Sequence, residues 1–317
     1  MSTVRFGAFS ARGLGAALLL GLAVLGGVAR AAELPPLPEA KTLKVFGVDI
    51  RYYEMGPDKP DAPTLVLLHG LGSNARDNWG AVMPALAATH RVLALDQLGF
   101  GGSAKPIIDY SIQLWVDTLG EFLREKKVGG FTLVGESLGG WIAAQYAIQA
   151  LQGIAADPAF TLPKPSRLVL CDAAGRRATM EQLFAPPPAG KRGPPAVSLA
   201  GVKGSVGAVF YTARVPRAGD LRASLEWNLN KDDGWTVHSV TSNLALLEEA
   251  VDGQLDAIRI PTLVIWGEHD RLVPVADGHW YAAGIAGAKL VLIPETAHIP
   301  MTEAPDAFLK VLQPFLR

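Results

Sequence analysis

The chain has 317 residues, with 29 Lys and Arg against 30 Asp and Glu, so its formal net charge is −1. Such near neutrality offers no basic stripe for a phosphate backbone, and we therefore expect no nucleic-acid partner. Hydrophobic residues make up 49% and charged residues 19%, which is a globular composition and excludes a disordered chain. The single cysteine, Cys171, excludes a disulfide within the chain and a cysteine-based zinc site.

The first 31 residues have the pattern of an export signal. Their charged side chains are all arginines, and an uncharged apolar stretch runs over residues 13–29. Residues 29–31 read Ala-Arg-Ala, with small residues at the two positions that a signal peptidase reads. The alternative is a retained membrane anchor, but the apolar stretch is shorter than the roughly 20 residues that span a bilayer. We therefore expect cleavage after Ala31, a periplasmic or secreted protein, and no stable membrane insertion of the mature chain.

Short apolar runs recur through the rest of the chain and predict buried strands. Their nearly continuous apolar character is typical of parallel strands that are covered on both faces. The runs lie at residues 64–68, 91–95, 131–134, 167–170, 262–265 and 289–293, and an antiparallel hairpin at 44–53 is expected to precede them. Amphipathic helical stretches such as 111–127 and 138–151 alternate with these runs. The pattern predicts an α/β fold with a mostly parallel central sheet and helices on both faces.

One long segment interrupts this alternation. Residues 176–255 contain no strong strand pattern, and they include a proline-rich passage at 185–195 followed by helical patterns. Ligands of a doubly wound sheet bind beyond the carboxyl ends of its strands, so a helical insertion after one of those ends would cover the site. We therefore predict a helical cap over 176–255, inserted after the sixth strand, between core parts at 32–175 and 256–317.

A nucleophile-elbow motif follows the third of the predicted core strands. Residues 135–140 read Gly-Glu-Ser-Leu-Gly-Gly, which places the pattern G-x-S-x-G between a strand and an alanine-rich helix. The glycines permit a tight turn, and Ser137 lies at the N-terminus of the helix, where free N–H groups favour developing negative charge. This context predicts that Ser137 is a nucleophile; the alternative is an idle serine in a glycine turn.

A serine is a poor nucleophile at neutral pH unless a base takes its proton. His298 follows the last predicted strand, at the same carboxyl edge as Ser137, and we expect it to be that base. His69 also ends a strand, but it opens a glycine-rich loop that suits another task. Asp270 follows the next-to-last strand and is expected to orient His298, with Asp172, which follows a different strand, as the alternative acid.

The remaining parts of a serine-based site are donors for the oxyanion and a pocket for the substrate. We expect the donors to be the backbone N–H groups of Leu138, in the elbow, and of Leu71, in the loop after the first core strand. An apolar acyl pocket could be lined by aromatic residues that otherwise form the core of the cap, namely Trp141, Phe184, Phe210, Tyr211 and Trp227. The chain contains no H-E-x-x-H metal motif and no P-loop, so we predict no cofactor and no metal site.

Four motifs in this order resemble the α/β-hydrolase superfamily. They are the His-Gly at 69–70, the segment Asp-Gln-Leu-Gly-Phe-Gly-Gly-Ser at 96–103, the elbow, and the order Ser137, Asp270, His298. The likeness covers nearly all of residues 42–317 and points to the capped group of esterases, epoxide hydrolases, dehalogenases and carbon–carbon bond hydrolases.

The nucleophile and the first loop discriminate within that group. The resemblance implies an aspartate at the position of Ser137 in dehalogenases and epoxide hydrolases, which disfavours both activities. The carbon–carbon hydrolases use serine, but they typically carry a glycine-rich run with proline where this chain has Leu-Gly-Ser-Asn at 71–74.

We therefore predict a secreted serine hydrolase that cleaves a carboxylic ester through an acyl-enzyme on Ser137. Its partner is expected to be a small-molecule substrate, an apolar acyl or aryl ester. One alternative is a serine-dependent hydrolase or acyltransferase that acts on a carbon–carbon, amide, lactone or thioester bond. A second alternative is a non-catalytic ligand-binding protein that keeps the fold, because a fold does not entail an activity.

Overall fold

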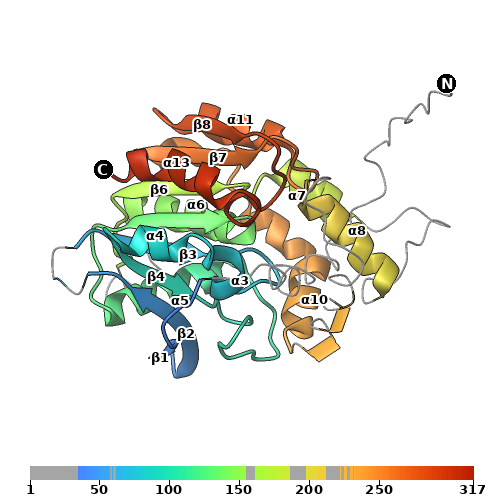
Figure 1. Ribbon diagram of the computed structural model, residues 1–317, viewed down its shortest axis with the longest axis horizontal. Coiled ribbons are helices and arrows are strands. Elements are labelled where there is room, and N and C mark those ends of the chain that lie inside the picture. The colour runs from blue at the N-terminus through green and yellow to red at the C-terminus, as the bar shows by residue number, and fades with distance from the viewer. Residues whose placement is uncertain are drawn as a thin grey trace.

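The computed structural model describes residues 35–57, 59, 62–154, 161–185, 198–211, 222, 225–226, 229–230 and 232–317 (Figure 1). The predicted signal at 1–31 lies outside these residues. Within the described ranges, no helix combines the length and the apolar character that a membrane span requires.

An eight-stranded sheet forms the framework, in the order β1-β2-β4-β3-β5-β6-β7-β8. The strands are β1 (Lys41–Val45), β2 (Val48–Met55), β3 (Thr64–Leu68), β4 (Arg91–Leu95), β5 (Thr132–Glu136), β6 (Arg167–Cys171), β7 (Thr262–Gly267) and β8 (Lys289–Ile293). β2 pairs antiparallel with β1 and with β4, as the expected edge hairpin requires. All pairings from β4 through β3 to β8 are parallel.

The six apolar runs coincide with β3 to β8, but three strands extend further than their runs, β6 by the single residue Cys171. β5 continues through Gly135 and Glu136, which pair with Leu170 and Cys171 of β6. β7 likewise continues to Gly267, which pairs with Ile293. A glycine and a glutamate do not prolong an apolar pattern, yet pairing with β3 and β6 holds Gly135 in register, and pairing with β6 holds Glu136.

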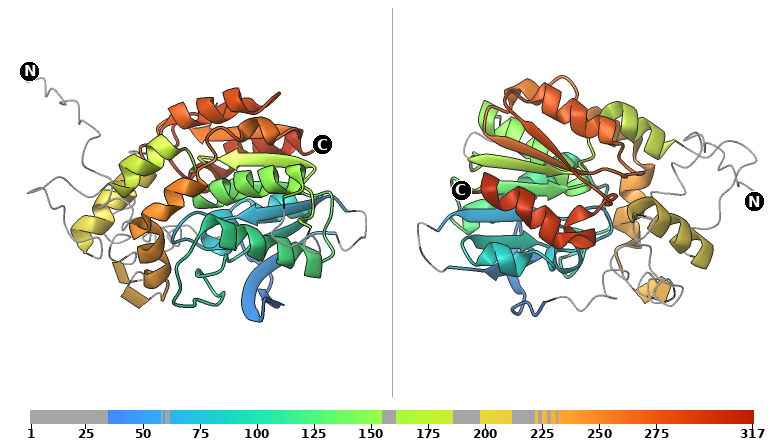
Figure 2. Two further views of the ribbon diagram at one scale, coloured as in Figure 1. Left: turned by 180° about the vertical axis from the view of Figure 1, so that it is seen from behind. Right: turned by 45° about the horizontal axis from the view of Figure 1, so that its top comes forward.

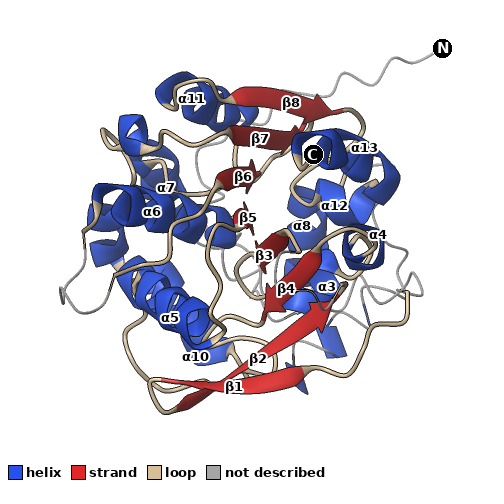
Figure 3. Ribbon diagram, turned by 90° about the vertical axis from the view of Figure 1, so that its left-hand side faces the viewer, coloured by secondary structure: helices blue, strands red, loops and turns tan. Residues whose placement is uncertain are grey.

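Helices cover both faces of the sheet (Figure 3). One face carries α5 (Ile112–Glu125), α6 (Leu138–Gln152) and α11 (Val275–Gly284). The other carries α3 (Ala75–Trp79), α4 (Met83–Ala87), α12 (Pro300–Glu303) and α13 (Pro305–Phe315). Every residue of β5 is buried, since this strand lies near the middle of the sheet with layers on both sides. The predicted layered α/β architecture is what results.

Between β6 and β7 the chain leaves the sheet and forms helices beyond one end of the strands (Figures 1 and 2). These are α7 (Arg177–Phe184), α8 (Leu199–Val209) and α10 (Gly234–Ser242), followed by short 3₁₀ helices at Leu244–Glu249 and Leu255–Ala257. Hydrogen bonds tie this insertion, which we call the cap, to the core. The Thr236 hydroxyl donates to the Gly99 carbonyl at 3.0 Å, and the Trp141 indole donates to the Glu249 carbonyl at 2.9 Å.

Candidate active site

Ser137 occupies a sharp turn between β5 and α6. Its backbone has φ 52° and ψ −116°, a conformation that residues with a side chain rarely adopt. The turn requires glycine at its flanks, because a Cβ on Gly135 would collide with the Gly139 carbonyl and a Cβ on Gly139 would collide with the Leu68 carbonyl. The packing of strand against helix therefore explains the G-x-S-x-G pattern and holds the serine in place.

Three predicted side chains meet in one hydrogen-bonded line. The Ser137 Oγ lies 2.9 Å from His298 Nε2, and His298 Nδ1 lies 2.8 Å from Asp270 Oδ2. The other oxygen of Asp270 accepts the backbone N–H groups of Leu272 at 2.8 Å and Val273 at 3.1 Å. Because Asp270 is fixed in this way, its Oδ2 accepts a hydrogen bond from Nδ1 and selects the tautomer with a proton on Nδ1. Nε2 is then left to accept the serine proton.

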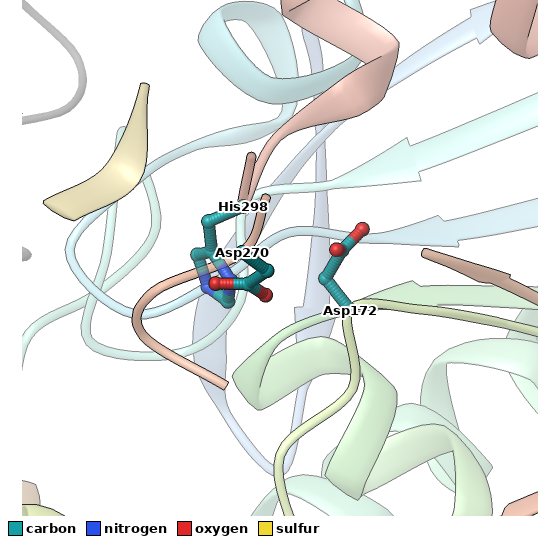
Figure 4. A group of neighbouring side chains, drawn as sticks. All are labelled: Asp172, Asp270 and His298. Atoms are coloured by element: carbon teal, nitrogen blue, oxygen red, sulfur yellow. The ribbon is translucent and has the colours of Figure 1, made fainter. Parts of the chain in front are cut away.

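Asp172, the alternative acid, lies beside Asp270 at the end of the neighbouring strand (Figure 4). Its Oδ1 accepts the Gly267 N–H at 2.8 Å. Burial raises the pKa of Asp172 well above its ordinary value, and the carboxylate of Asp270 raises it further. These effects favour the neutral form of Asp172, and the carboxylate that reaches the imidazole belongs to Asp270.

These groups also have the spacing of metal ligands. Asp172, Asp270 and His298 each present one nitrogen or oxygen, and these atoms lie within 4.8 Å of one another. Both nitrogens of His298 are engaged, however, one by Ser137 and one by Asp270. A metal ion would have to break one of these bonds, so we interpret the cluster as a hydrogen-bonded set.

Glu136 is a buried carboxyl that the motif alone does not reveal, because it occupies the variable position of the elbow. Its Oε1 lies 3.4 Å from His298 Nε2. Burial raises the pKa of Glu136 to about 7, and nearby Asp270 adds to this, although His298 acts in the opposite direction. The available signal was a charged residue at the end of an otherwise apolar run.

The imidazole lies in a field of carboxyl groups. Burial lowers the pKa of His298, but Asp270, Glu136 and Glu303 together outweigh burial, so the pKa is raised above the ordinary histidine value. The ring is consequently a stronger base than a histidine in water.

His69 serves the loop after β3. Its Nε2 accepts the Gln97 N–H at 3.0 Å, and its Nδ1 lies 2.8 Å from the Gly70 carbonyl, to which it donates. Burial lowers the pKa of His69, so the ring stays neutral and both nitrogens are used. This histidine joins the ends of β3 and β4 and is not free to act as a base.

The two expected oxyanion donors border the same cavity as Ser137. Leu71 and Leu138 both line it, and no protein acceptor is assigned to either backbone N–H within the described residues. The Gly70 N–H, by contrast, donates to Asn78 Oδ1 at 3.0 Å. Two unengaged N–H groups next to the serine hydroxyl are what a developing oxyanion requires.

The cavity beside Ser137 is small and apolar. Its volume is about 30 Å³. Its lining consists of Leu71, Ser137, Leu138, Trp141, Ala174, Met180, Leu183, Phe184, Val240, Leu272 and Val273. Of the predicted pocket residues, Trp141 and Phe184 are therefore in the lining, whereas Trp227 lies outside the described residues.

Phe210 and Tyr211 lie elsewhere, because the end of α8 runs against the loop that carries His298. The Val209 carbonyl accepts the backbone N–H of His298 at 2.9 Å. Glu303 accepts the N–H of Tyr211 at 2.7 Å, and the Tyr211 ring stacks on His269 with 4.8 Å between centroids. Val209 and Tyr211 thus connect the end of the cap helix α8 to the core, and neither Phe210 nor Tyr211 lines the cavity.

The family model described as "Alpha/beta hydrolase family" matches residues 65–311, which is most of the chain. The chain belongs to the alpha/beta hydrolase family. The expected fold is thereby confirmed, with its mostly parallel sheet and its helices after the sixth strand, and so is the resemblance to this superfamily.

Individual relatives are similar over most of the chain. An uncharacterized protein of Mycobacterium tuberculosis is 28% identical over 268 residues, which cover 80% of this chain and 75% of the relative. The 2-hydroxy-6-oxo-6-(2'-aminophenyl)hexa-2,4-dienoic acid hydrolase of Metapseudomonas resinovorans is 26% identical over 281 residues, covering 85% and 88%. A crystal structure of a membrane phospholipase A, described as a bacterial virulence factor, has a TM-score of 0.68 at 26% identity and covers 95% and 91%. Family membership places the chain among hydrolases, and the bond it cleaves has to be argued from the site.

Proposed function

We propose that this protein is a serine hydrolase that cleaves a carboxylic ester through an acyl-enzyme on Ser137. The observation that carries the proposal is the continuous line of hydrogen bonds from Asp270 through His298 to Ser137, at 2.8 and 2.9 Å. A serine in this arrangement has a base in contact, an anchored carboxylate behind the base, and free N–H groups beside it.

In the acylation half, the Ser137 Oγ attacks the acyl carbon while its proton passes to His298 Nε2. The carbonyl oxygen becomes an oxyanion and accepts the N–H groups of Leu71 and Leu138, each worth about 3–4 kcal/mol of barrier. When the carbonyl re-forms, the bond to the leaving alcohol breaks, and His298 donates its proton to the alcohol oxygen. Asp270 keeps the ring oriented and stabilises the imidazolium throughout.

The deacylation half repeats these steps with water. His298 Nε2 takes a proton from a water molecule, whose oxygen attacks the acyl carbon of the ester on Ser137. The same two N–H groups hold the second oxyanion. The bond to Oγ then breaks, the serine recovers its proton from His298, and a carboxylic acid leaves.

The cavity indicates an uncharged and short acyl group. All its lining side chains are apolar apart from the Ser137 hydroxyl. A volume of about 30 Å³ compares with roughly 10–15 Å³ for one water molecule on the same kind of measure. A chain much longer than acetyl or propionyl would fit only if α7 or α10 moved away from the core.

Carbon–carbon bond hydrolysis is the second candidate, because the Metapseudomonas resinovorans relative is a dienoic acid hydrolase by name. Such an acid is ionised at neutral pH. Its carboxylate would need a cationic side chain or several hydrogen-bond donors, because an unpaired buried charge is costly. No charged side chain is among the cavity-lining residues of the described structure, and this favours an ester as the substrate.

The test uses the purified protein, a fluorophosphonate probe and a series of p-nitrophenyl esters from acetate to octanoate, with Ser137→Ala as the control. We expect labelling and ester turnover in the wild type and neither in the folded variant. Labelling without turnover of any ester would show that Ser137 is activated but that the enzyme cleaves a bond of another type. Absence of labelling would show that Ser137 is not activated and would favour a ligand-binding protein.

We also propose that the mature protein is exported and begins at Ala32. The support is the arginine-bearing apolar segment that ends in Ala-Arg-Ala at 29–31. Mass spectrometry of the protein recovered from the periplasm or medium of its native host should find Ala32 at the N-terminus. A retained Met1 would favour a membrane anchor instead.

A further inference from the structure

The Nε2 atom of His298 has two oxygen neighbours, and only one of them belongs to the proposed nucleophile. The Ser137 Oγ lies at 2.9 Å and the Glu136 Oε1 at 3.4 Å. Both the histidine and the glutamate side chains are withdrawn from solvent, with exposed fractions of 0% and 1%. A carboxyl this close to the atom that shuttles the proton is in a position to influence each transfer.

Glu136 Oε1 has no hydrogen-bond partner in the described part of the chain, although it is buried. A buried carboxylate oxygen without a donor is costly, so native proteins rarely leave one unsatisfied. The donor that the geometry provides is the Nε2–H group, which exists only while the imidazole is protonated. The orphaned oxygen is therefore matched to the imidazolium and not to the resting ring.

The other oxygen of Glu136 is confined by the loop after β3. A Cβ added at Gly70 would collide with Glu136 Oε2, so the glycine of the His-Gly pair leaves the space that this carboxyl occupies. The nearby polar groups of Gly70 and Asn78 lower the pKa of Glu136, against the larger opposite effect of burial. The side chain is thus held on the Nε2 side of the ring.

We propose that Glu136 is a positioning residue for His298. It accepts a hydrogen bond from Nε2–H while the ring is an imidazolium, and it keeps the ring between Ser137 and the leaving group. This inference rests on the proposed serine-hydrolase function and adds a second carboxylate to it, on the opposite nitrogen from Asp270.

The proton inventory of the cycle is unchanged by this role. The proton leaves the Ser137 Oγ, resides on Nε2, and goes to the leaving oxygen; in the second half the source is water and the destination is Oγ. Glu136 gains and loses no proton in these steps. Because its pKa is about 7, Glu136 is mainly ionised above that pH, and its carboxylate then lowers the free energy of the imidazolium. Its position resists rotation of the ring once Oγ has become an ester oxygen.

Other acidic groups around His298 are oriented differently. Asp270 faces Nδ1 at 2.8 Å, and Asp172 bonds to the Gly267 N–H. Glu303 is satisfied by the backbone N–H groups of Ala297 and Tyr211. Glu136 is the one among these four that the structure places within 3.4 Å of Nε2. Removing its charge therefore tests the Nε2 side of the ring separately.

The direct experiment is an NMR titration of the His298 ring in the full chain, labelled with ¹⁵N-histidine and assigned with a His298→Gln variant. We compare Glu136→Gln, Glu136→Asp and a matched control, Glu249→Gln. Glu249 is also a partly buried carboxyl whose pKa burial raises, but it accepts the Gln113 N–H at 2.6 Å and is not among the groups that shift the pKa of His298. Loss of an adjacent carboxylate typically lowers the pKa of a cation by about one unit or more.

We expect Glu136→Gln to lower the His298 pKa by about one unit, Glu136→Asp to lower it less, and Glu249→Gln to leave it unchanged. In ester assays the acid limb of kcat/KM should move down in pH by a similar amount. On the plateau kcat should fall about tenfold, which is less than the roughly 10²–10⁴-fold that a general base itself contributes, because the base remains in place. A fall in kcat with the His298 titration unmoved would show a merely structural role and overturn the proposal. An unchanged titration and unchanged kinetics would overturn it as well.

The NMR readout needs no turnover and therefore separates this inference from the proposed function. If the wild type cleaves no ester but the His298 titration responds to Glu136→Gln, the reaction class is wrong and the Glu136–His298 relation stands. If the wild type cleaves esters but the His298 titration does not respond to Glu136→Gln, the proposed reaction class stands and the Glu136–His298 relation is wrong. Should Glu136→Gln fail to fold, the comparison of Glu136→Asp with the wild type decides in the same way.

Discussion

Replacing Asp270 by asparagine tests the proposed mechanism most sharply, because the structure dictates how the new amide must lie. The backbone N–H groups of Leu272 and Val273 donate to one oxygen of Asp270 at 2.8 and 3.1 Å. In the variant these donors require the amide oxygen at that position, which turns the NH₂ group toward His298. The ring must then accept at Nδ1 and carry its proton on Nε2, so it no longer accepts a proton from Ser137.

The expected loss in kcat is about 10⁴-fold, the size found where a triad carboxylate is converted to an amide and the imidazole is held in the wrong tautomer. At 1.36 kcal/mol per factor of ten, this corresponds to about 5 kcal/mol of barrier. Little stability should be lost, because both backbone hydrogen bonds survive. The assay is steady-state hydrolysis of a p-nitrophenyl ester, with circular dichroism to verify the fold.

Asp172→Asn is the matched comparison, since it makes the same change on the neighbouring strand. Its amide oxygen can still accept the Gly267 N–H, and the hydrogen bond between Asp270 and His298 does not involve it. We expect this variant to keep most of the activity. The reasoning is refuted if Asp172→Asn is the crippling change, or if Asp270→Asn keeps more than about a tenth of the wild-type rate.

Three further outcomes follow from the same geometry. Because the base must be unprotonated and the pKa of His298 is raised, kcat/KM should increase with pH through a midpoint above the ordinary value of about 6.5; a midpoint below that value would contradict the carboxylate field around the ring. Burial raises the pKa of Asp172, so its contribution to stability is present below the unfolded-state pKa of about 3.9 and is lost as pH rises through the folded-state pKa. The Tm of Asp172→Asn should therefore rise relative to that of the wild type as pH increases from 4 to 8. A difference in Tm that stays constant with pH would show that Asp172 is ionised in the folded protein. Phe184→Ala should shift ester preference toward longer acyl chains, by up to about fourfold in kcat/KM for each methylene group accommodated. Phe210 is equally buried but lies outside the cavity, so Phe210→Ala should not change the preference. Equal shifts in both variants would mean that the cavity beside Ser137 is not the acyl pocket.

The strands and the elbow follow from local sequence, since both depend on residues that are adjacent in the chain. Continuous apolar runs predict β3 to β8 because a strand covered on both faces has no polar side to present. A glycine pair around Ser137 predicts the turn, because a side chain at Gly135 would collide with the backbone of α6 and one at Gly139 with the backbone at the end of β3. The ends of β5 and β7 were harder to predict, since pairing with a neighbouring strand extends them beyond their apolar runs.

What the sequence by itself determined is the fold class and the edge of the sheet at which polar residues gather, because the alternation of apolar runs and amphipathic stretches along the chain places the strands, and the polar motifs follow those runs. It left Asp172 and Asp270 as alternatives, since β6 and β7 are neighbours and both residues follow strand ends. Only the tertiary structure decided that Asp270 reaches His298, that Glu136 faces Nε2, and that Phe210 and Tyr211 lie outside the cavity. Those contacts are distances between remote segments, such as the 161 positions that separate Ser137 from His298. Side-chain direction across such separations is set by packing of the whole domain, which no local pattern records.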